Sequence, residues 1–241
     1  MILAAPRTGS NMLCTLLGSH PDVLCHHELF NPAEPYYALE LRGDSFHLGG
    51  VEERDRDPLA FLDRAWSADL GHSHVGFKMT HRQNEFVLDA VLHDAGVRKI
   101  VLRRSNRVRT YVSRLISEET GQWEVYSDAD LVRERPRVHV DVDALRRSID
   151  ENERYYDDVE GLLDATTQRY LGVSFERLVE GGERTRLLEY LGLPEADRAA
   201  TVLAVRSVRQ NPAPLRELVA NFAELERVLA GTELASELEE T

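Results

Sequence analysis

The chain contains little cysteine, little lysine and no long apolar run. Two cysteines among 241 residues are too few for a disulfide scaffold, and they indicate a reducing compartment. No apolar stretch approaches the roughly 20 residues that span a bilayer. The apolar segment at residues 1–5 is also shorter than the roughly 7–15 residues of a signal-peptide core. We therefore expect a cytoplasmic protein without a membrane span.

A basic surface is lacking as well. The formal net charge is −13 at pH 7, which argues against nucleic acid or an anionic membrane as a partner, because both require a basic face. The histidines are scattered, and Cys14 and Cys25 are eleven positions apart, so we expect no metal site. The chain length and the apolar share of 42% suffice for one substantial core, and we predict a single domain over residues 1–241.

Short apolar segments alternate with helical patterns along most of the chain. Strands are predicted at residues 1–5, 22–25, 75–79, 99–103 and 170–174. Strands that alternate with helices indicate a central parallel sheet with helices on both faces, which is the α/β class. A helix of about 25 residues is predicted from Val142, and a single C-terminal helix is predicted from Pro214 to Leu229.

The most informative stretch is a glycine turn, Pro6–Asn11, between the first strand and the first helix. Such a P-loop-like turn aims successive backbone N–H groups at one point, beside the positive end of the helix dipole. It predicts a socket for a tetrahedral anion. A Walker loop for nucleoside triphosphates is disfavoured, because the turn has one glycine and no Gly-Lys pair. Side-chain donors around Gly9 are Arg7, Thr8, Ser10 and Asn11.

A second anion site is indicated by residues 97–117. This stretch has seven basic residues and no acidic one, in a chain that is otherwise strongly acidic. It again has the pattern strand, turn, helix, and an arginine fork binds phosphate through two parallel hydrogen bonds. A solvated basic helix face would explain this stretch taken alone. Two predicted anion sites at strand ends of one sheet favour a ligand with two separated anionic groups.

These segments carry a family resemblance. Pro6–Asn11 and the following helix resemble the 5′-phosphosulfate loop of sulfotransferases that use 3′-phosphoadenosine 5′-phosphosulfate (PAPS), although many members have threonine at the position of Asn11. Leu102–Ser113 is similar to their 3′-phosphate motif. Val173–Pro194 resembles their aromatic-Glu-x-Leu stretch and the helix after it. Arg209–Pro212 is similar to the C-terminal part of the bacterial carbohydrate branch, the trehalose and nodulation-factor type.

The resemblance implies an enzyme that transfers a sulfuryl group from PAPS to a hydroxyl of a small-molecule or carbohydrate acceptor. Arg7 and its turn would hold the phosphosulfate, and a strand-end arginine with Ser113 would hold the 3′-phosphate. For that arginine we prefer Arg104 to Arg103, because Arg104 lies nearer the end of the strand. The implied nucleotide-binding residues are Arg7, Thr8, Gly9, Ser10, Asn11, Arg103, Arg104, Ser113 and Arg209.

The resemblance gives two candidates for the base that takes the proton of the acceptor hydroxyl. Glu28, in the context HELFNP, matches the catalytic glutamate of carbohydrate sulfotransferases. Beside an anionic sulfate its pKa should be raised towards neutrality. His81, in the context KMTH, is one residue off the Lys-x-His spacing of phenol and steroid sulfotransferases, in which the histidine is the base. Lys78 could reach the transferred group or form an ion pair with an acidic residue.

Two other functions remain open on the sequence alone. A non-catalytic nucleotide-binding module of sulfotransferase fold would keep the anion sites without a base, and Glu28 argues against it. A P-loop-like small-molecule kinase would need a Walker lysine and metal carboxylates, which the sequence lacks. The long helix and the C-terminal helix could supply the surface of a homodimer. Aromatic residues that could stack on an acceptor are Tyr36, Tyr37, Trp123 and Tyr126.

Overall fold

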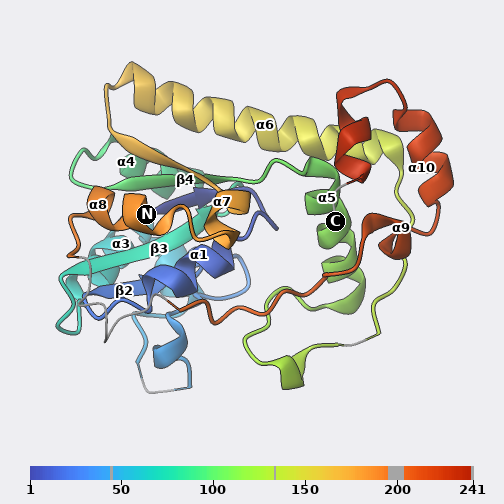
Figure 1. Ribbon diagram of the computed structural model, residues 1–241. Coiled ribbons are helices and arrows are strands. Elements are labelled where there is room, and N and C mark those ends of the chain that lie inside the picture. Colours follow the sequence, from blue (N-terminus) through green and yellow to red (C-terminus); the bar gives the residue numbers. More distant parts are fainter. Residues whose placement is uncertain (44–45, 133, 195–203, 240–241) are drawn as a thin grey trace.

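The computed structural model describes residues 1–43, 46–132, 134–194 and 204–239, and within them five parallel strands form a central sheet in the order β2-β3-β1-β4-β5 (Figure 1). Each strand begins and ends within one residue of its predicted position, and the parallel pairing confirms the α/β class. The strands are β1 (Ile2–Ala4), β2 (Val23–His26), β3 (His74–Thr80), β4 (Lys99–Arg103) and β5 (Tyr170–Ser174).

Successive residues of the central strand face opposite layers of helices. Ile2 and Ala4 of β1 pack in one cluster with the helices at residues 10–17, 175–179 and 184–191, whereas Leu3 and Ala5 pack in another with the helices at residues 85–93 and 142–165. This alternation follows from the two-residue period of a strand, and it confirms that helices cover both faces. The helices are α1 (Ser10–Leu17), α2 (Val51–Arg56), α3 (Pro58–Ser67), α4 (Glu85–His93), α5 (Arg107–Thr120), α6 (Val142–Ala165), α7 (Phe175–Val179), α8 (Arg184–Leu191), α9 (Leu215–Leu218) and α10 (Phe222–Leu229), with 3₁₀ turns at Leu39–Leu41, Asp128–Asp130 and Glu233–Leu238.

The strand register brings four turns to one edge of the sheet. β1 lies between β3 and β4, and its last residue, Ala4, pairs with Thr80 and Leu102. Because all strands run in the same direction, the segments after β1, β2, β3 and β4 emerge at the same edge. Ligands of parallel α/β sheets bind outside the carboxyl ends of the strands. The fold thus places all the predicted anion-binding turns where a ligand is expected.

The long helix α6 crosses above the sheet (Figure 1) and confirms the predicted helix from Val142. The side chain of Asp141 caps its N-terminus by accepting the N–H of Ala144 at 2.7 Å. Its apolar stripe packs inside the chain, with Ile149 in a cluster with α5 and α10 and Leu163 against the sheet. The stripe is therefore not free to form a dimer surface, and a homodimer stays a prediction.

The predicted single helix from Pro214 to Leu229 is wrong. Two helices, α9 and α10, are separated by an extended residue, Val219. The break is stabilised by Val138, whose N–H donates to the Leu218 carbonyl and whose carbonyl accepts from Ala220, both at 2.8 Å. Backbone pairing with a distant segment thus replaces a turn of helix, although the apolar spacing is helical throughout.

Candidate active site

A cavity of about 1350 Å³ opens at the carboxyl ends of the strands. Its walls come from the turn after β1, the segments after β2 and β3, the start of α5 and residues 205–211. Thr8 and Arg103 are not part of the lining. The predicted site residues that line the cavity are Arg7, Gly9, Ser10, Asn11, Glu28, Lys78, His81, Arg104, Ser113 and Arg209.

The turn between β1 and α1 has two residues in the left-handed region of backbone conformation. Arg7 has a φ of 66° and Gly9 a φ of 92°. A side chain at Gly9 is excluded by space as well, since an added Cβ would lie 2.3 Å from Cδ2 of Phe175. Gly9 begins α1 without a side-chain cap. The N–H groups of the first helical turn are therefore not engaged by a capping side chain, as an anion socket requires.

The guanidinium of Arg7 connects three other segments of the cavity. Nε donates to Oγ of Ser113 at 3.1 Å, and the two terminal nitrogens donate to the Trp123 carbonyl and, at 3.1 Å, to Oε1 of Gln210. Burial, followed by the charge of Arg135, lowers the pKa of Arg7 to about 10. Arg7 therefore stays a cation at neutral pH, and it lies at the strand end where the sequence predicts an anion.

The two neighbouring arginines at the end of β4 have different surroundings. Arg103 binds Glu153 at 2.9 Å and Glu160 at 2.8 Å, both on α6. Arg104 lines the cavity, with Cζ 4.5 Å from the ring centroid of Phe175. Its Nε is buried without a hydrogen-bond partner among the described residues, and burial lowers the pKa of Arg104 to about 10. Arg104 thus has an unused donor, whereas Arg103 is engaged by two carboxylates.

The remaining side chains of the glycine turn differ in what they contact. Thr8 is buried, and its hydroxyl donates to the Ala5 carbonyl at 2.7 Å. This hydrogen bond fixes the shape of the turn and takes the Thr8 hydroxyl away from the cavity. Ser10 and Asn11 both line the cavity, and Oδ1 of Asn11 is buried without a partner in the described ranges.

Ser113 of α5 joins the glycine turn to the C-terminal segment. Its Oγ accepts hydrogen bonds from Nε of Arg7 and, at 3.2 Å, from Nδ2 of Asn211. Arg109, one turn earlier on the helix, donates to the Asn211 carbonyl at 2.8 Å. These contacts fix the segment that carries Arg209, which is exposed at the rim of the cavity. The sequence analysis assigns no role to Asn211, whose one signal there is the resemblance at residues 209–212.

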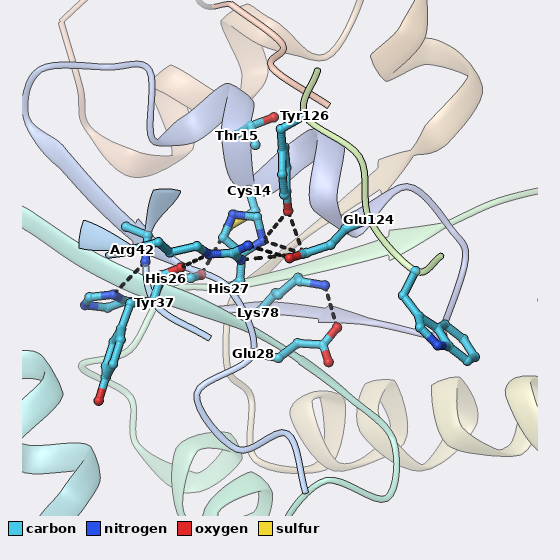
Figure 2. A network of polar contacts seen from close by, with 12 residues as sticks. Cys14, Thr15, His26, His27, Glu28, Tyr37, Arg42, Lys78, Glu124 and Tyr126 are labelled. Atoms are coloured by element: carbon cyan, nitrogen blue, oxygen red, sulfur yellow. Dashed lines mark hydrogen bonds and ion pairs between the residues drawn. The ribbon is translucent and has the colours of Figure 1, made fainter. Parts of the chain in front are cut away.

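Glu28 and Lys78 form an ion pair in the wall of the cavity (Figure 2). Nζ of Lys78 lies 2.5 Å from Oε1 of Glu28, and Oε2 accepts hydrogen bonds from Asn31 and Gln83, both at 2.7 Å. Burial opposes ionisation of Glu28, but the charge of Lys78 and the hydrogen bonds together outweigh it and lower the pKa of Glu28. The raised pKa that the sequence analysis expects for Glu28 beside an anionic sulfate stays a prediction.

His81 follows β3 and lines the same cavity, but its contacts are with α6. Its Nε2 is 3.2 Å from Oδ1 of Asn152, and its ring centroid is 5.6 Å from that of Tyr155. The amide oxygen is an acceptor, so Nε2 carries the proton and Nδ1 is the ring nitrogen that can accept one. Burial lowers the pKa of His81, and the imidazole is therefore neutral at pH 7.

A second polar network lies beside the ion pair (Figure 2). The hydroxyl of Tyr126 donates to Oε2 of Glu124 at 2.7 Å and lies 3.1 Å from Nδ1 of His27. Arg42 forms an ion pair with the same glutamate. Burial and the charge of Lys78 hold the pKa of His27 well below its ordinary value. His27 is therefore a neutral, buried member of this network.

Comparison with known proteins gives relatives over nearly the whole chain. Nodulation protein H of Rhizobium tropici is 27% identical over 238 residues, which cover 96% of this chain and 89% of the relative. Nodulation protein H of Rhizobium meliloti (strain 1021) is 28% identical over 232 residues, or 93% of this chain and 88% of the relative. No protein-family model matches the chain. Among solved structures, a sulfotransferase from Alicyclobacillus acidocaldarius is 17% identical with a TM-score of 0.46, over 99% of this chain and 93% of that one.

These relatives indicate a sulfotransferase enzyme. The alignments of the two nodulation proteins span at least 93% of the chain. They also agree with the branch that the sequence motifs resemble. The cavity of this sulfotransferase is the one described above, at the carboxyl ends of the strands.

Two of the four aromatic residues predicted to meet an acceptor line the cavity of the sulfotransferase. They are Tyr36 and Trp123, and Trp123 is about half exposed. Tyr37 instead accepts the N–H of Leu48 at 2.9 Å and packs edge-on against His26. Tyr126 is held by Glu124 and His27.

The described part of the sulfotransferase has no group of three or more histidine, cysteine, aspartate or glutamate side chains that could hold a metal ion. Among the helices within the described ranges, none combines the length and the apolar character needed to cross a membrane.

Proposed function

We propose that this sulfotransferase takes its sulfuryl group from PAPS and transfers it to a hydroxyl of a small-molecule or carbohydrate acceptor. The proposal is carried by one observation. Arg7 and Arg104, at the ends of neighbouring strands, line the same cavity as Glu28 and Lys78. PAPS has two separate anionic groups, and two cations at separate strand ends match them.

The residues at the cavity fit such a nucleotide. Arg7 and the uncapped turn at Gly9 would hold the 5′-phosphosulfate. Arg104 and Ser113 would hold the 3′-phosphate, and the unpartnered Nε of Arg104 is a donor that a phosphate would satisfy. Arg209 would add charge from the rim. Arg103 is left out of this assignment, because its guanidinium is engaged by two carboxylates.

Sulfuryl transfer resembles phosphoryl transfer, in which a protein mainly positions the reactants and stabilises charge on the leaving oxygen. PAPS supplies the group that moves. The cation of Arg7 would stabilise charge on the leaving phosphate, and Lys78 would stabilise the transferred group. When Lys78 turns towards an anion, Glu28 loses its nearest cation and its pKa rises. Glu28 thus becomes a stronger base when it is needed to accept the proton of the acceptor hydroxyl.

His81 is the second candidate for the base. Its Nδ1 can accept a proton, but Nε2 is bound to Asn152 and the ring packs against α6. Glu28 is preferred, because it shares its place with Lys78 and both line the cavity. The acceptor would lie between Glu28 and the aromatic side chains of Tyr36 and Trp123.

The donor can be tested with the product nucleotide. Adenosine 3′,5′-bisphosphate at about 100 times its Kd should stabilise the enzyme by about 2.7 kcal/mol, which a thermal-shift assay detects easily. ATP with Mg²⁺ should give no shift. If ATP with Mg²⁺ stabilises the enzyme and the bisphosphate does not, the chain binds a different donor and the proposal is wrong. Labelled PAPS with a panel of sugars, phenols and alcohols then identifies the acceptor.

A further inference from the structure

The carboxylate of Glu28 is surrounded by donors on both oxygens. Oε1 faces Nζ of Lys78, while Oε2 accepts from Nδ2 of Asn31 and from Nε2 of Gln83. A carboxylate has about four acceptor positions, so three of them are filled by the protein. The remaining position is on Oε1, beside Lys78.

Both amides are fixed in the orientation that donates. Oδ1 of Asn31 accepts the N–H of Ala33 at 3.0 Å, and Oε1 of Gln83 accepts the N–H of Thr80 at 3.3 Å. With each amide oxygen held by a backbone N–H, each NH₂ group must point at Glu28. A protonated Glu28 would present a donor hydrogen to groups that are themselves donors. The arrangement therefore favours the ionised form of Glu28.

The backbone around the amides is itself held in place. Arg54 of α2 is buried and donates to the carbonyls of Leu29, at 3.2 Å, and Asn31, at 2.6 Å. On the other side, the turn that carries Gln83 contains Arg82 with a φ of 67°. A left-handed arginine is a strained conformation that persists only where the surroundings impose it.

The charged and titratable groups that face Glu28 come from two further elements and from its own segment. Lys78 approaches from β3, and the charge of Arg7 acts from the turn after β1. Tyr36 lies on the segment after β2. Its pKa is raised mainly by burial, then by the charges of two other glutamates, and then by the charge of Glu28. The two cations favour an ionised Glu28, as the amides do.

We propose that Asn31 and Gln83 are positioning residues that keep Glu28 ionised and direct its free acceptor position on Oε1 towards the acceptor hydroxyl. The role of the carboxylate as base rests on the proposed function. The pair of hydrogen bonds from Asn31 and Gln83 to Glu28, which we call the clamp, does not rest on it. The two amides add no charge to the cavity. They fix the plane of the Glu28 carboxylate when Lys78 turns to an anion. Oε1 therefore still points towards the acceptor hydroxyl after Lys78 has moved.

The clamp can be tested by ¹³C NMR titration of the Glu28 side-chain carboxyl, assigned with Glu28→Gln. Gln83→Met and Asn31→Leu keep approximate volume and remove the donors. Each should raise the pKa of Glu28 by about one unit, because each removes a hydrogen bond to a charged group. Gln122→Met is the matched control. Gln122 lines the same cavity but bonds to Asp130, Val132 and Arg135, so its loss should leave that pKa unchanged.

A second readout separates the clamp from the proposed base. With any accepted hydroxyl compound, the acid limb of the kcat/KM profile, which reports the free enzyme, should move to higher pH in Gln83→Met by the same amount as the NMR pKa. If the NMR pKa is unchanged in both variants while their melting temperatures match wild type, the clamp is overturned. If the NMR pKa moves and the kcat/KM profile does not, the clamp stands and Glu28 is not the base.

Discussion

The ring of Phe175 occupies the space that a side chain at Gly9 would need. An added Cβ would come within 2.3 Å of Cδ2 and 2.5 Å of Cε2 of this ring. The same ring lies under the guanidinium of Arg104. Phe175 therefore links the two predicted anion sites, because it packs against the glycine turn of one and the arginine of the other.

Gly9→Ala should destabilise the protein and weaken nucleotide binding. The substitution strains a backbone at φ 92° and pushes Phe175 away from Arg104. We expect a loss of about 1–3 kcal/mol in the free energy of unfolding, measured by denaturant titration, and a larger Kd for adenosine 3′,5′-bisphosphate. Gly172→Ala is the control, since nothing lies within 4 Å of an added Cβ there. Equal effects of the two substitutions would contradict the account.

Arg104→Ala should weaken binding of adenosine 3′,5′-bisphosphate and hardly change binding of adenosine 5′-phosphosulfate, which lacks the 3′-phosphate. A charged hydrogen-bonded contact of this kind contributes about 1.5–3 kcal/mol, and calorimetry measures both affinities. Equal losses for the two ligands would remove Arg104 from the 3′-phosphate site.

Arg103→Ala provides the neighbouring control. Its guanidinium binds Glu153 and Glu160 on α6, so its loss should leave the affinity for the bisphosphate unchanged. A drop in affinity as large as that of Arg104→Ala would show that the two arginines share the phosphate.

The ion pair of Glu28 and Lys78 predicts how stability depends on pH. The pKa of Glu28 is lowered in the folded state, so the unfolded chain binds more protons at acidic pH. The stability that ionised Glu28 contributes is then present above about pH 5 and is lost as the pH falls through the folded-state pKa. Glu28→Gln should therefore melt below wild type at pH 7, and the difference should shrink at pH 4. A difference that is constant or grows towards pH 4 would contradict the pairing.

Much of the fold could be predicted because its signals are local. The spacing of apolar residues in the strands and in α6 needs no knowledge of distant contacts. The break at Val219 could not be predicted in this way, since it depends on backbone pairing with Val138. The position of Gly9 between strand and helix likewise predicted the turn, although its contact with Phe175 requires the folded chain.

The site was predictable where charge and position coincide. Arg7 and Lys78 stand at strand ends, and both line the cavity. The amides of Asn31 and Gln83 carry no such signal, because asparagine and glutamine are ordinary residues of polar loops. The lowered pKa of Glu28 carries no sequence signal either, because it is set by the pairing with Lys78 and by these two amides, and none of these contacts is visible in the sequence.

Single-turnover sulfate transfer, with saturating PAPS and an identified acceptor, tests most directly which residue is the base. Glu28→Gln keeps the shape of the side chain but accepts no proton, so the rate should fall by about 10²–10⁴-fold while donor affinity stays near wild type. His81→Ala should cost much less, because His81 is bound to Asn152 and packs against α6. If His81→Ala abolishes transfer and Glu28→Gln leaves it intact, the base is His81 and the central assignment is wrong.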